Sequence, residues 1–72
     1  MRETILKMKK SLEDSHYIAL VSSNPNYDFG IRKSDDIKFL DDETMLIHRQ
    51  SGNQTIINLN LIIGVCIVRE WI

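Results

Sequence analysis

The clearest pattern in the chain is an alternation of apolar residues between residues 54 and 68. Every odd position from Ile57 to Ile67 is apolar, and a spacing of two predicts strand structure because successive strand side chains point to opposite faces. Asn58 and Asn60 interrupt the even positions, so the segment forms either one long strand or two strands that separate near residues 58–60. Other even positions are apolar, which makes part of the segment apolar on both faces: Ile56, Ile62, Cys66 and Val68.

The first residues of the chain follow a helical period instead. Ile5, Met8 and Leu12 are three or four residues apart and form one apolar stripe, while lysines occupy other positions around the helix. No glycine or proline interrupts this region. The pattern predicts an amphipathic helix over residues 2–14, within a helical segment 1–15.

Short runs of branched and aromatic residues, separated by turn residues, predict an antiparallel meander over residues 16–72. A loop is expected around Pro25, a turn at residues 41–43, and a hairpin turn at Gly52, which can adopt a positive φ. Gly30 inside a strand indicates a bulge or a sharp bend. The expected strands cover residues 16–22, 27–33, 37–40 and 44–50, and then the segment from residue 54 onward.

Together these elements predict an α+β fold in a single domain of residues 1–72. The amphipathic N-terminal helix is expected to pack on a strongly bent antiparallel sheet of five to six strands, or on a small β-barrel. Closing such a sheet would remove strand edges that otherwise favour aggregation.

The length of the chain bears on how it is stabilised. A domain of this size buries only about 60% of its unfolded surface, so its stability as a monomer is marginal. Cys66 is the only cysteine, and the two histidines lack the paired spacing of a structural metal site. Oligomerisation is the remaining means of stabilisation. The residues expected to contact a second copy or a protein partner are Ile56, Ile62, Val68, Trp71 and Ile72.

Charge and hydropathy restrict the class of partner. The formal net charge is -1, so the chain has no overall field that would attract a nucleic acid. No apolar run reaches the roughly 20 residues of a membrane span, and the first residues lack the apolar core of a signal peptide, so a cytoplasmic location is expected. Nucleic-acid contact would depend on local groups: Lys7, Lys9 and Lys10 on the helix, and Asn58 and Asn60 in the last segment.

Candidate catalytic and metal-binding residues have simpler structural explanations. Clustered carboxylates can bind Mg²⁺ or Ca²⁺, but the acidic residues here lack the spacing of a calcium loop and fit turns better. His16 and His48 are expected to be structural, and Cys66 is expected to be a buried, unreactive thiol. No nucleotide-binding or hydrolase motif is present. We therefore expect no catalytic residue, metal or cofactor, and no enzymatic activity. The clustered acidic residues considered as metal ligands are Asp35, Asp36, Asp41, Asp42 and Glu43.

The order of a helix and a meander, ending in an apolar strand, a short turn and the strand Leu61–Val65, resembles the Sm and Hfq family of small β-barrels. The resemblance covers residues 36–68 best. It implies a bent five-stranded sheet capped by an N-terminal helix, ring assembly through pairing of the last two strands, and RNA binding. The Lys-His pair of the bacterial members, which would fall near Leu59 and Asn60, is absent.

Three functional hypotheses follow from the sequence. The leading hypothesis is a small non-enzymatic binding or regulatory module that self-associates and acts through protein contacts. The alternative is an Sm-like oligomeric RNA-binding protein. The third is a small enzyme with a site near His48 or the acidic turn.

Overall fold

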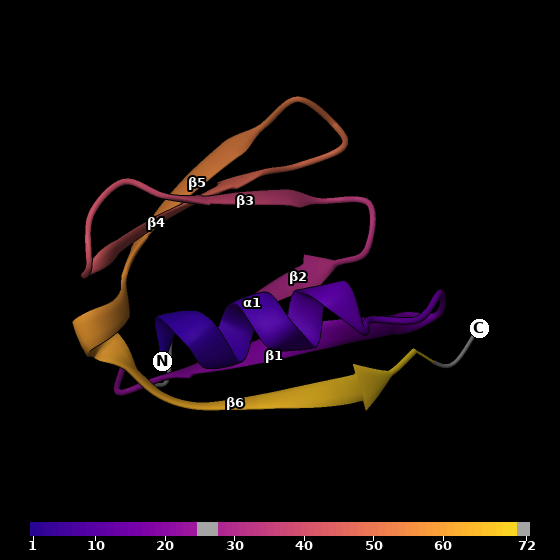
Figure 1. The fold of residues 1–72 in the computed structure, drawn as a ribbon, viewed down its shortest axis with the longest axis horizontal. Coiled ribbons are helices and arrows are strands. Elements are labelled where there is room, and N and C mark those ends of the chain that lie inside the picture. The colour runs from indigo at the N-terminus through magenta and orange to yellow at the C-terminus, as the bar shows by residue number, and fades with distance from the viewer. Residues whose placement is uncertain (25–27, 71–72) are drawn as a thin grey trace.

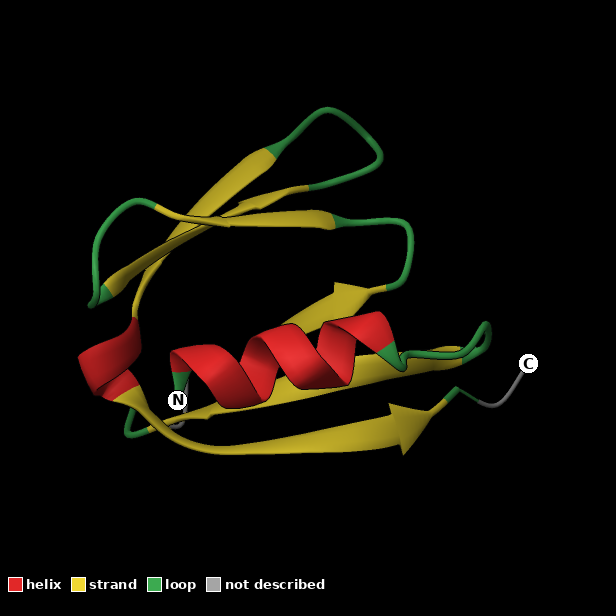
Figure 2. Cartoon of the chain, viewed as in Figure 1, coloured by secondary structure: helices red, strands yellow, loops and turns green. Residues whose placement is uncertain are grey.

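The computed structural model describes residues 1–24 and 28–70 and shows an α+β fold (Figure 1). In this described part, one helix, α1, is followed by six strands, and a single turn of 3-10 helix, η1, precedes the last strand (Figure 2). The elements are α1 (Arg2–Lys10), β1 (His16–Ser22), β2 (Asp28–Arg32), β3 (Asp36–Phe39), β4 (Thr44–His48), β5 (Gln54–Asn58), η1 (Leu59–Leu61) and β6 (Ile62–Arg69).

The strands form two antiparallel sheets rather than the single sheet expected from the sequence. One sheet has the order β2-β1-β6 and the other has the order β3-β4-β5. Figure 1 shows them as two layers, joined at one end by the short connection from β2 to β3 and at the other by η1. No closed barrel forms among the described residues, because β2 and β3 are not paired with each other, nor are β5 and β6.

Helix α1 ends four residues earlier than the apolar period predicts. The hydroxyl of Ser11 donates a hydrogen bond to the carbonyl of Lys7 at 3.1 Å. Such a side-chain bond competes with the backbone hydrogen bonds that would continue the helix. Leu12 lies beyond the helix, yet it is 4% exposed and belongs to the core. Its apolar character was therefore interpreted correctly as buried, but wrongly as helical. Ser15 then reverses the chain into β1 with a φ of 67°.

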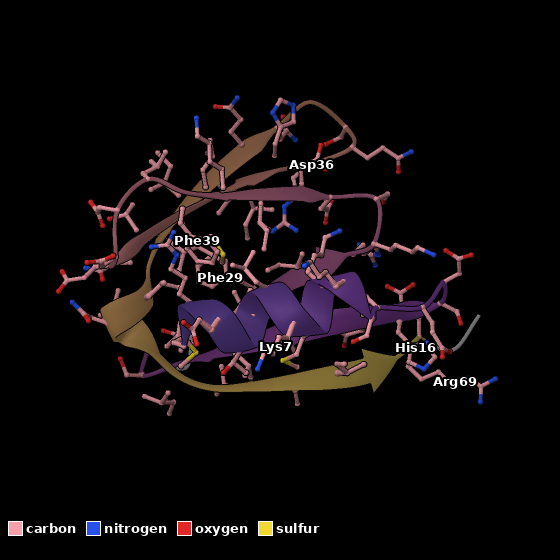
Figure 3. All side chains as sticks on the ribbon, viewed as in Figure 1. Lys7, His16, Phe29, Asp36, Phe39 and Arg69 are labelled. Carbon is pink, nitrogen blue, oxygen red and sulfur yellow. The ribbon has the colours of Figure 1, made fainter. Side chains whose placement is uncertain are left out.

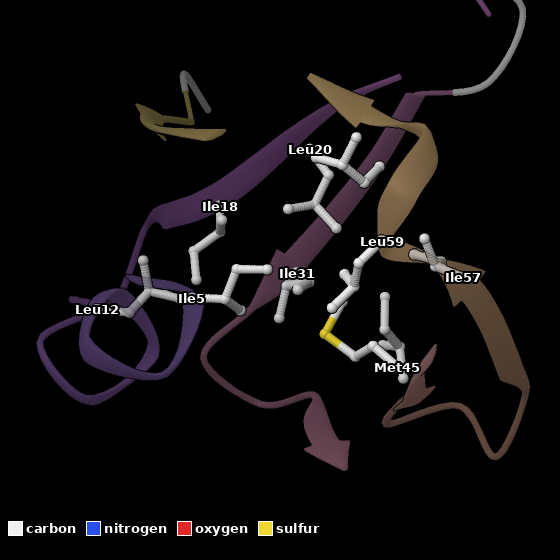
Figure 4. Packing of buried hydrophobic residues seen from close by; sticks show 10 residues of the cluster. Ile5, Leu12, Ile18, Leu20, Ile31, Met45, Ile57 and Leu59 are labelled. Carbon is white, nitrogen blue, oxygen red and sulfur yellow. The ribbon is translucent and has the colours of Figure 1, made fainter. Parts of the chain in front are cut away.

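The core lies between the two sheets and includes residues from one side of α1 (Figure 4). Inward residues alternate with outward residues along the strands, as the spacing of two predicts: in β4, Met45 and Ile47 are buried, whereas Leu46 is half-buried. Burial of each such side chain contributes about 1.5–3 kcal/mol relative to leaving it exposed. The core residues are Ile5, Leu12, Ile18, Leu20, Ile31, Met45, Ile47, Ile57, Leu59 and Ile62.

The structure confirms the role predicted for Gly52 but not the one predicted for Gly30. Gly52 has a φ of 96° in the turn between β4 and β5, which confirms the predicted hairpin. Gly30 pairs with Ala19 in regular register, so the bulge or bend predicted there is wrong. A Cβ at Gly30 would lie 3.4 Å from Cδ2 of Tyr17, so glycine leaves room for that ring to lie against the strand. An irregularity does occur elsewhere, between β1 and β6 at Val21/Ser22.

The boundaries of the other elements agree closely with the sequence pattern. The first strand has the predicted bounds, and β2, β3 and β4 fall in the predicted regions with ends that differ by one or two residues. Pro25 and the predicted strand start at Tyr27 lie outside the described residues, as do Trp71 and Ile72. Within the described part of the chain, no helix is long and apolar enough to cross a membrane.

Candidate self-association interface

A break at residues 58–61 divides the alternating segment into two strands. The side chain of Asn58 accepts a hydrogen bond from the backbone N–H of Asn60 at 2.9 Å, which caps η1. The N–H of Leu59 donates to the carbonyl of Glu43 at 2.6 Å, and the Leu59 side chain is buried. The chain therefore turns from one sheet into the other at this point, and the two-strand alternative is the correct one.

Both strands of this segment are edge strands. Among the described residues, β5 pairs only with β4, and β6 pairs only with β1. Each strand therefore presents backbone N–H and C=O groups along a free edge, where a further strand can pair. No charged residue occurs between Arg49 and Arg69, so neither edge has the lysines with which proteins commonly block such pairing.

Each free edge also carries a strongly exposed isoleucine. Ile56 on β5 is 65% exposed and Ile63 on β6 is 69% exposed, the two highest values among the exposed large apolar side chains described. Of the residues predicted to contact a partner, Ile56 is thus available, whereas Val68 is half-buried. Ile62 is 6% exposed and belongs to the core, so its side chain stabilises the monomer instead.

The register of β6 shows which of its apolar residues share a face with core residues of β1. Val65 and Ile67 lie opposite the buried Leu20 and Ile18, but only Val65 packs against the core, whereas Ile67 is 45% exposed. Cys66 lies opposite Ala19 on the other side, and it is exposed. The prediction of a buried thiol is therefore wrong, because no described element covers that face.

A partly buried ion pair connects the two sheets on the side away from η1. Nη1 of Arg49 lies 3.1 Å from Oδ2 of Asp35 and also donates to the carbonyl of Gly30. The Asp35 carboxylate accepts further hydrogen bonds from the backbone N–H groups of Arg32 and Gln50. The network joins the β2–β3 connection to the residues that follow β4. No sequence motif indicated it, since Asp35 and Arg49 are 14 residues apart.

The environment of Asp35 acts on its pKa in two directions. Burial raises the pKa, since it disfavours the charged carboxylate, but the hydrogen bonds from Arg32, Gln50 and Arg49 outweigh burial. The pKa of Asp35 is consequently below its ordinary value, and the side chain is a charged structural group. A lowered pKa makes a carboxylate a weaker base, and both oxygens of Asp35 already accept hydrogen bonds within the fold.

A polar cavity of about 390 Å³ lies beside this ion pair. The cavity offers no free charge to a ligand, because Arg49 is bound to Asp35, and Arg32 to Glu70 at 2.5 Å. No buried polar side-chain atom in the described residues lacks a hydrogen-bond partner. The cavity is therefore explained by the structural contacts of its walls: Gly30, Arg32, Ser34, Asp35, Arg49, Gln50 and Ser51.

The groups considered for nucleic-acid contact do not form one surface. Lys7, Lys9 and Lys10 lie in the last turn of α1, and Nζ of Lys9 donates to the carbonyl of Lys33 at 2.8 Å. Asn58 caps η1 at the opposite end of the molecule from that turn, as Figure 1 shows. Asn60 is exposed beside the start of α1, where it lines a shallow cavity with Arg2.

The acidic residues and histidines are separated as well. The Asp41 side chain accepts a hydrogen bond from the N–H of Glu43, as expected for a turn, and this bond lowers the pKa of Asp41. His48 is exposed on β4 opposite Asp36 of β3, whose side chain projects away from the core (Figure 3). His16 contacts the carbonyl of Asp14 through Nδ1. No group of three or more metal-ligating side chains occurs among the residues described.

Comparison of the chain with known protein families, with curated proteins and with solved structures found no match. The function is therefore inferred from the residues of this chain alone.

Proposed function

We propose that this chain is a small non-enzymatic binding module that self-associates by pairing the free edge of β5 with the free edge of β6 from a second copy. One observation carries the proposal. β5 and every residue of β6 before Arg69 lie in the uncharged stretch that follows Arg49, and each strand exposes an isoleucine, Ile56 or Ile63. Natural edge strands are commonly protected by charge or proline, so two unprotected edges in one chain favour pairing with each other.

Pairing of this kind is heterologous, because β5 of one copy contacts a different strand of the next. Each copy keeps one free edge of each type, so assembly continues until a ring closes or a filament grows. The strand order β6-β1-β2 followed by β3-β4-β5 runs once around the molecule through the two connections, which supports a bent, barrel-like relationship of the sheets. Pairing of the last two strands is also what the resemblance to the Sm and Hfq family implies.

Two charged variants test the pairing. Ile56→Lys blocks β5 and Cys66→Lys blocks β6, and both side chains are exposed, so neither substitution removes a core residue. Leu40→Lys is the matched control, because Leu40 is 50% exposed but follows β3 and belongs to neither edge. Sedimentation velocity at micromolar concentration is expected to show oligomers for the original chain and for Leu40→Lys. Each of the two edge variants should sediment as a monomer.

Mixing the two edge variants provides the sharper test. The Ile56→Lys protein retains a usable β6 and the Cys66→Lys protein retains a usable β5, so the mixture should form a one-to-one complex that grows no further. A symmetric contact between like edges would not restore association in the mixture. The proposal fails if the original chain is a strict monomer, or if the mixed variants remain apart.

RNA binding by an assembled ring is the second candidate function. The strand order described above favours it, whereas the net charge of -1 and the separation of Lys7–Lys10 from Asn58 do not supply a continuous basic surface. Titration of labelled RNA at two salt concentrations decides between the two. Binding through phosphate contacts must weaken as salt rises, because it releases counterions. Absence of any binding at low salt would leave protein association as the function.

A further inference from the structure

A small apolar groove runs along the free edge of β5. Ile56 and Ile57 both line it, although consecutive strand side chains point to opposite faces, so the groove must follow the edge of the strand between those faces. None of the described residues that line it is charged. The groove has a volume of about 200 Å³ and is lined by Ser22, Phe29, Ile56, Ile57, Asn58 and Leu61.

The free edge of β6 carries a side chain of matching character. Val21 pairs with Gly64 and Ser22 pairs with Ile62, so Ile63 is an extra residue in β6 that has no partner position in β1. Such a bulge bends the strand and redirects the side chain of the extra residue. Ile63 is 69% exposed and does not line the groove of its own chain.

We infer that Ile63 of one copy inserts into the β5 groove of the next copy, and this inference rests on the edge pairing proposed above. In an antiparallel pairing centred on both strands, the middle of β5 lies opposite the middle of β6. Ile63, near the start of β6, then lies opposite the Asn58 end of β5, where Asn58 and Leu61 line the groove.

A second copy fits this groove better than a charged or polar partner. Residues 54–68 contain no charge, so pairing of the two edges buries no ion and incurs no cost for removing one from water. The contact would cover the most exposed apolar side chain on β6 and, through the groove, Ile56 on β5 and Leu61 on η1. Both halves of the contact are present on every copy.

The one-to-one complex of the two edge variants allows the test, because it contains a single interface. In that complex the Ile56→Lys protein presents β6, and the Cys66→Lys protein presents β5 with its groove. Ile63→Ala placed in the protein that presents β6 should weaken association roughly 50-fold in calorimetric titration, since it removes three buried carbon atoms. The same Ile63→Ala change placed in the other protein should leave affinity unchanged, which makes it a matched control for effects on folding.

Leu61→Ala tests the groove itself, so it is placed in the protein that presents β5. It should weaken association by about tenfold there, less than Ile63→Ala because a residue in the groove wall is covered on one side only, and it should leave affinity unchanged in the other protein. Ile63 and Leu61 are both more than half exposed, so neither change should unfold the monomer, and circular dichroism checks this. If Ile63→Ala gives the same affinity whichever of the two proteins carries it, the insertion of Ile63 is wrong, although the edges still pair. If the one-to-one complex does not form at all, both proposals fail.

Discussion

Asp35 and Arg49 meet at 3.1 Å and join the β2–β3 connection to the end of β4. The Asp35 side chain is 7% exposed and the Arg49 side chain 24% exposed, so the pair is largely shielded from water. Every oxygen of the carboxylate has a donor: Oδ1 accepts from the Gln50 N–H, and Oδ2 from the Arg32 N–H and from Arg49. The two sheets share no strand, so this contact contributes directly to how they are held together.

Loss of this carboxylate should destabilise the fold strongly. Asp35→Ala is expected to lower the free energy of unfolding by about 3 kcal/mol, because it leaves a shielded guanidinium and two backbone N–H groups without their acceptor. Urea unfolding followed by circular dichroism measures the change. Asp36→Ala is the control, since Asp36 is exposed, and it should change the free energy by less than about 0.5 kcal/mol. Equal effects of the two changes would contradict the role of Asp35.

The lowered pKa of Asp35 makes stability depend on pH in the acid range. A carboxyl group with a lower pKa in the folded state than in the unfolded state stabilises the fold above the unfolded value, about 3.9 for aspartate. That contribution disappears as the pH falls through the folded pKa. Thermal unfolding between neutral pH and pH 2 should therefore show stability falling below about pH 4.

The Asp35→Asn variant isolates this contribution. Its stability should be lower at neutral pH and fall less steeply in acid, because the group that titrates has been removed. Asp41 also has a lowered pKa, from the Glu43 N–H and the Thr44 hydroxyl, so Asp41→Asn is measured beside it. Parallel acid curves for the original chain and for Asp35→Asn would show that Asp35 is not responsible.

Ile47 tests the packing between the sheets, since it is completely buried on the inward face of β4. Ile47→Val should cost about 0.5–1.5 kcal/mol and Ile47→Ala about 2–5 kcal/mol, because the larger deletion leaves a cavity. Leu40→Ala, at a half-exposed position, should cost far less. The free energy of unfolding of each variant is measured by urea unfolding at one protein concentration. A similar cost for Leu40→Ala and Ile47→Ala would mean that the core lies elsewhere.

Gly52 is constrained by its backbone conformation and not by space. Its φ is 96°, and apart from its two chain neighbours no described residue has a heavy atom within 4 Å of the position that a Cβ would occupy. Gly52→Ala should therefore destabilise the hairpin by about 1–2 kcal/mol through backbone strain alone. Ser51→Ala in the same turn serves as the control in thermal unfolding. A neutral Gly52→Ala change would contradict the left-handed conformation.

Cys66 provides a simple check on the uncovered face of β6. The thiol is exposed, so a disulfide reagent should modify it in the folded protein without denaturant, and Cys66→Ser should abolish the reaction. Absorbance of the released reagent group measures the rate. A thiol that reacts only after unfolding would restore the buried cysteine expected from the sequence and contradict the exposure of this face.

Local patterns in the sequence predicted most elements of the fold. The alternation of Met45 and Ile47 with polar or half-buried neighbours placed β4 and its inward face correctly, and the turn at Gly52 followed from its conformational freedom. The end of α1 could not be read from the helical period, because Leu12 continues the period while its side chain enters the core from outside the helix. Burial, rather than local propensity, decided its position.

The candidate interface was predicted only in outline. The apolar character of both faces of the last strand indicated surplus apolar surface, and Ile56 is indeed exposed. The sequence could not separate Ile62 from Ile63, because the bulge opposite Val21 and Ser22 depends on pairing with a strand some 40 residues earlier. That pairing buries Ile62 and leaves Ile63 in solvent.

By itself, the sequence determined the N-terminal helix, most strands and their inward positions, and the absence of charge between Arg49 and Arg69; it left the break near Asn58 as one of two alternatives. These features depend on side-chain period, turn chemistry and composition, all of which are local. The tertiary structure alone decided that the strands divide into two sheets, that Asp35 meets Arg49, and that β5 and β6 are both free edges. Those features depend on which distant segments lie side by side, and no local pattern specifies that.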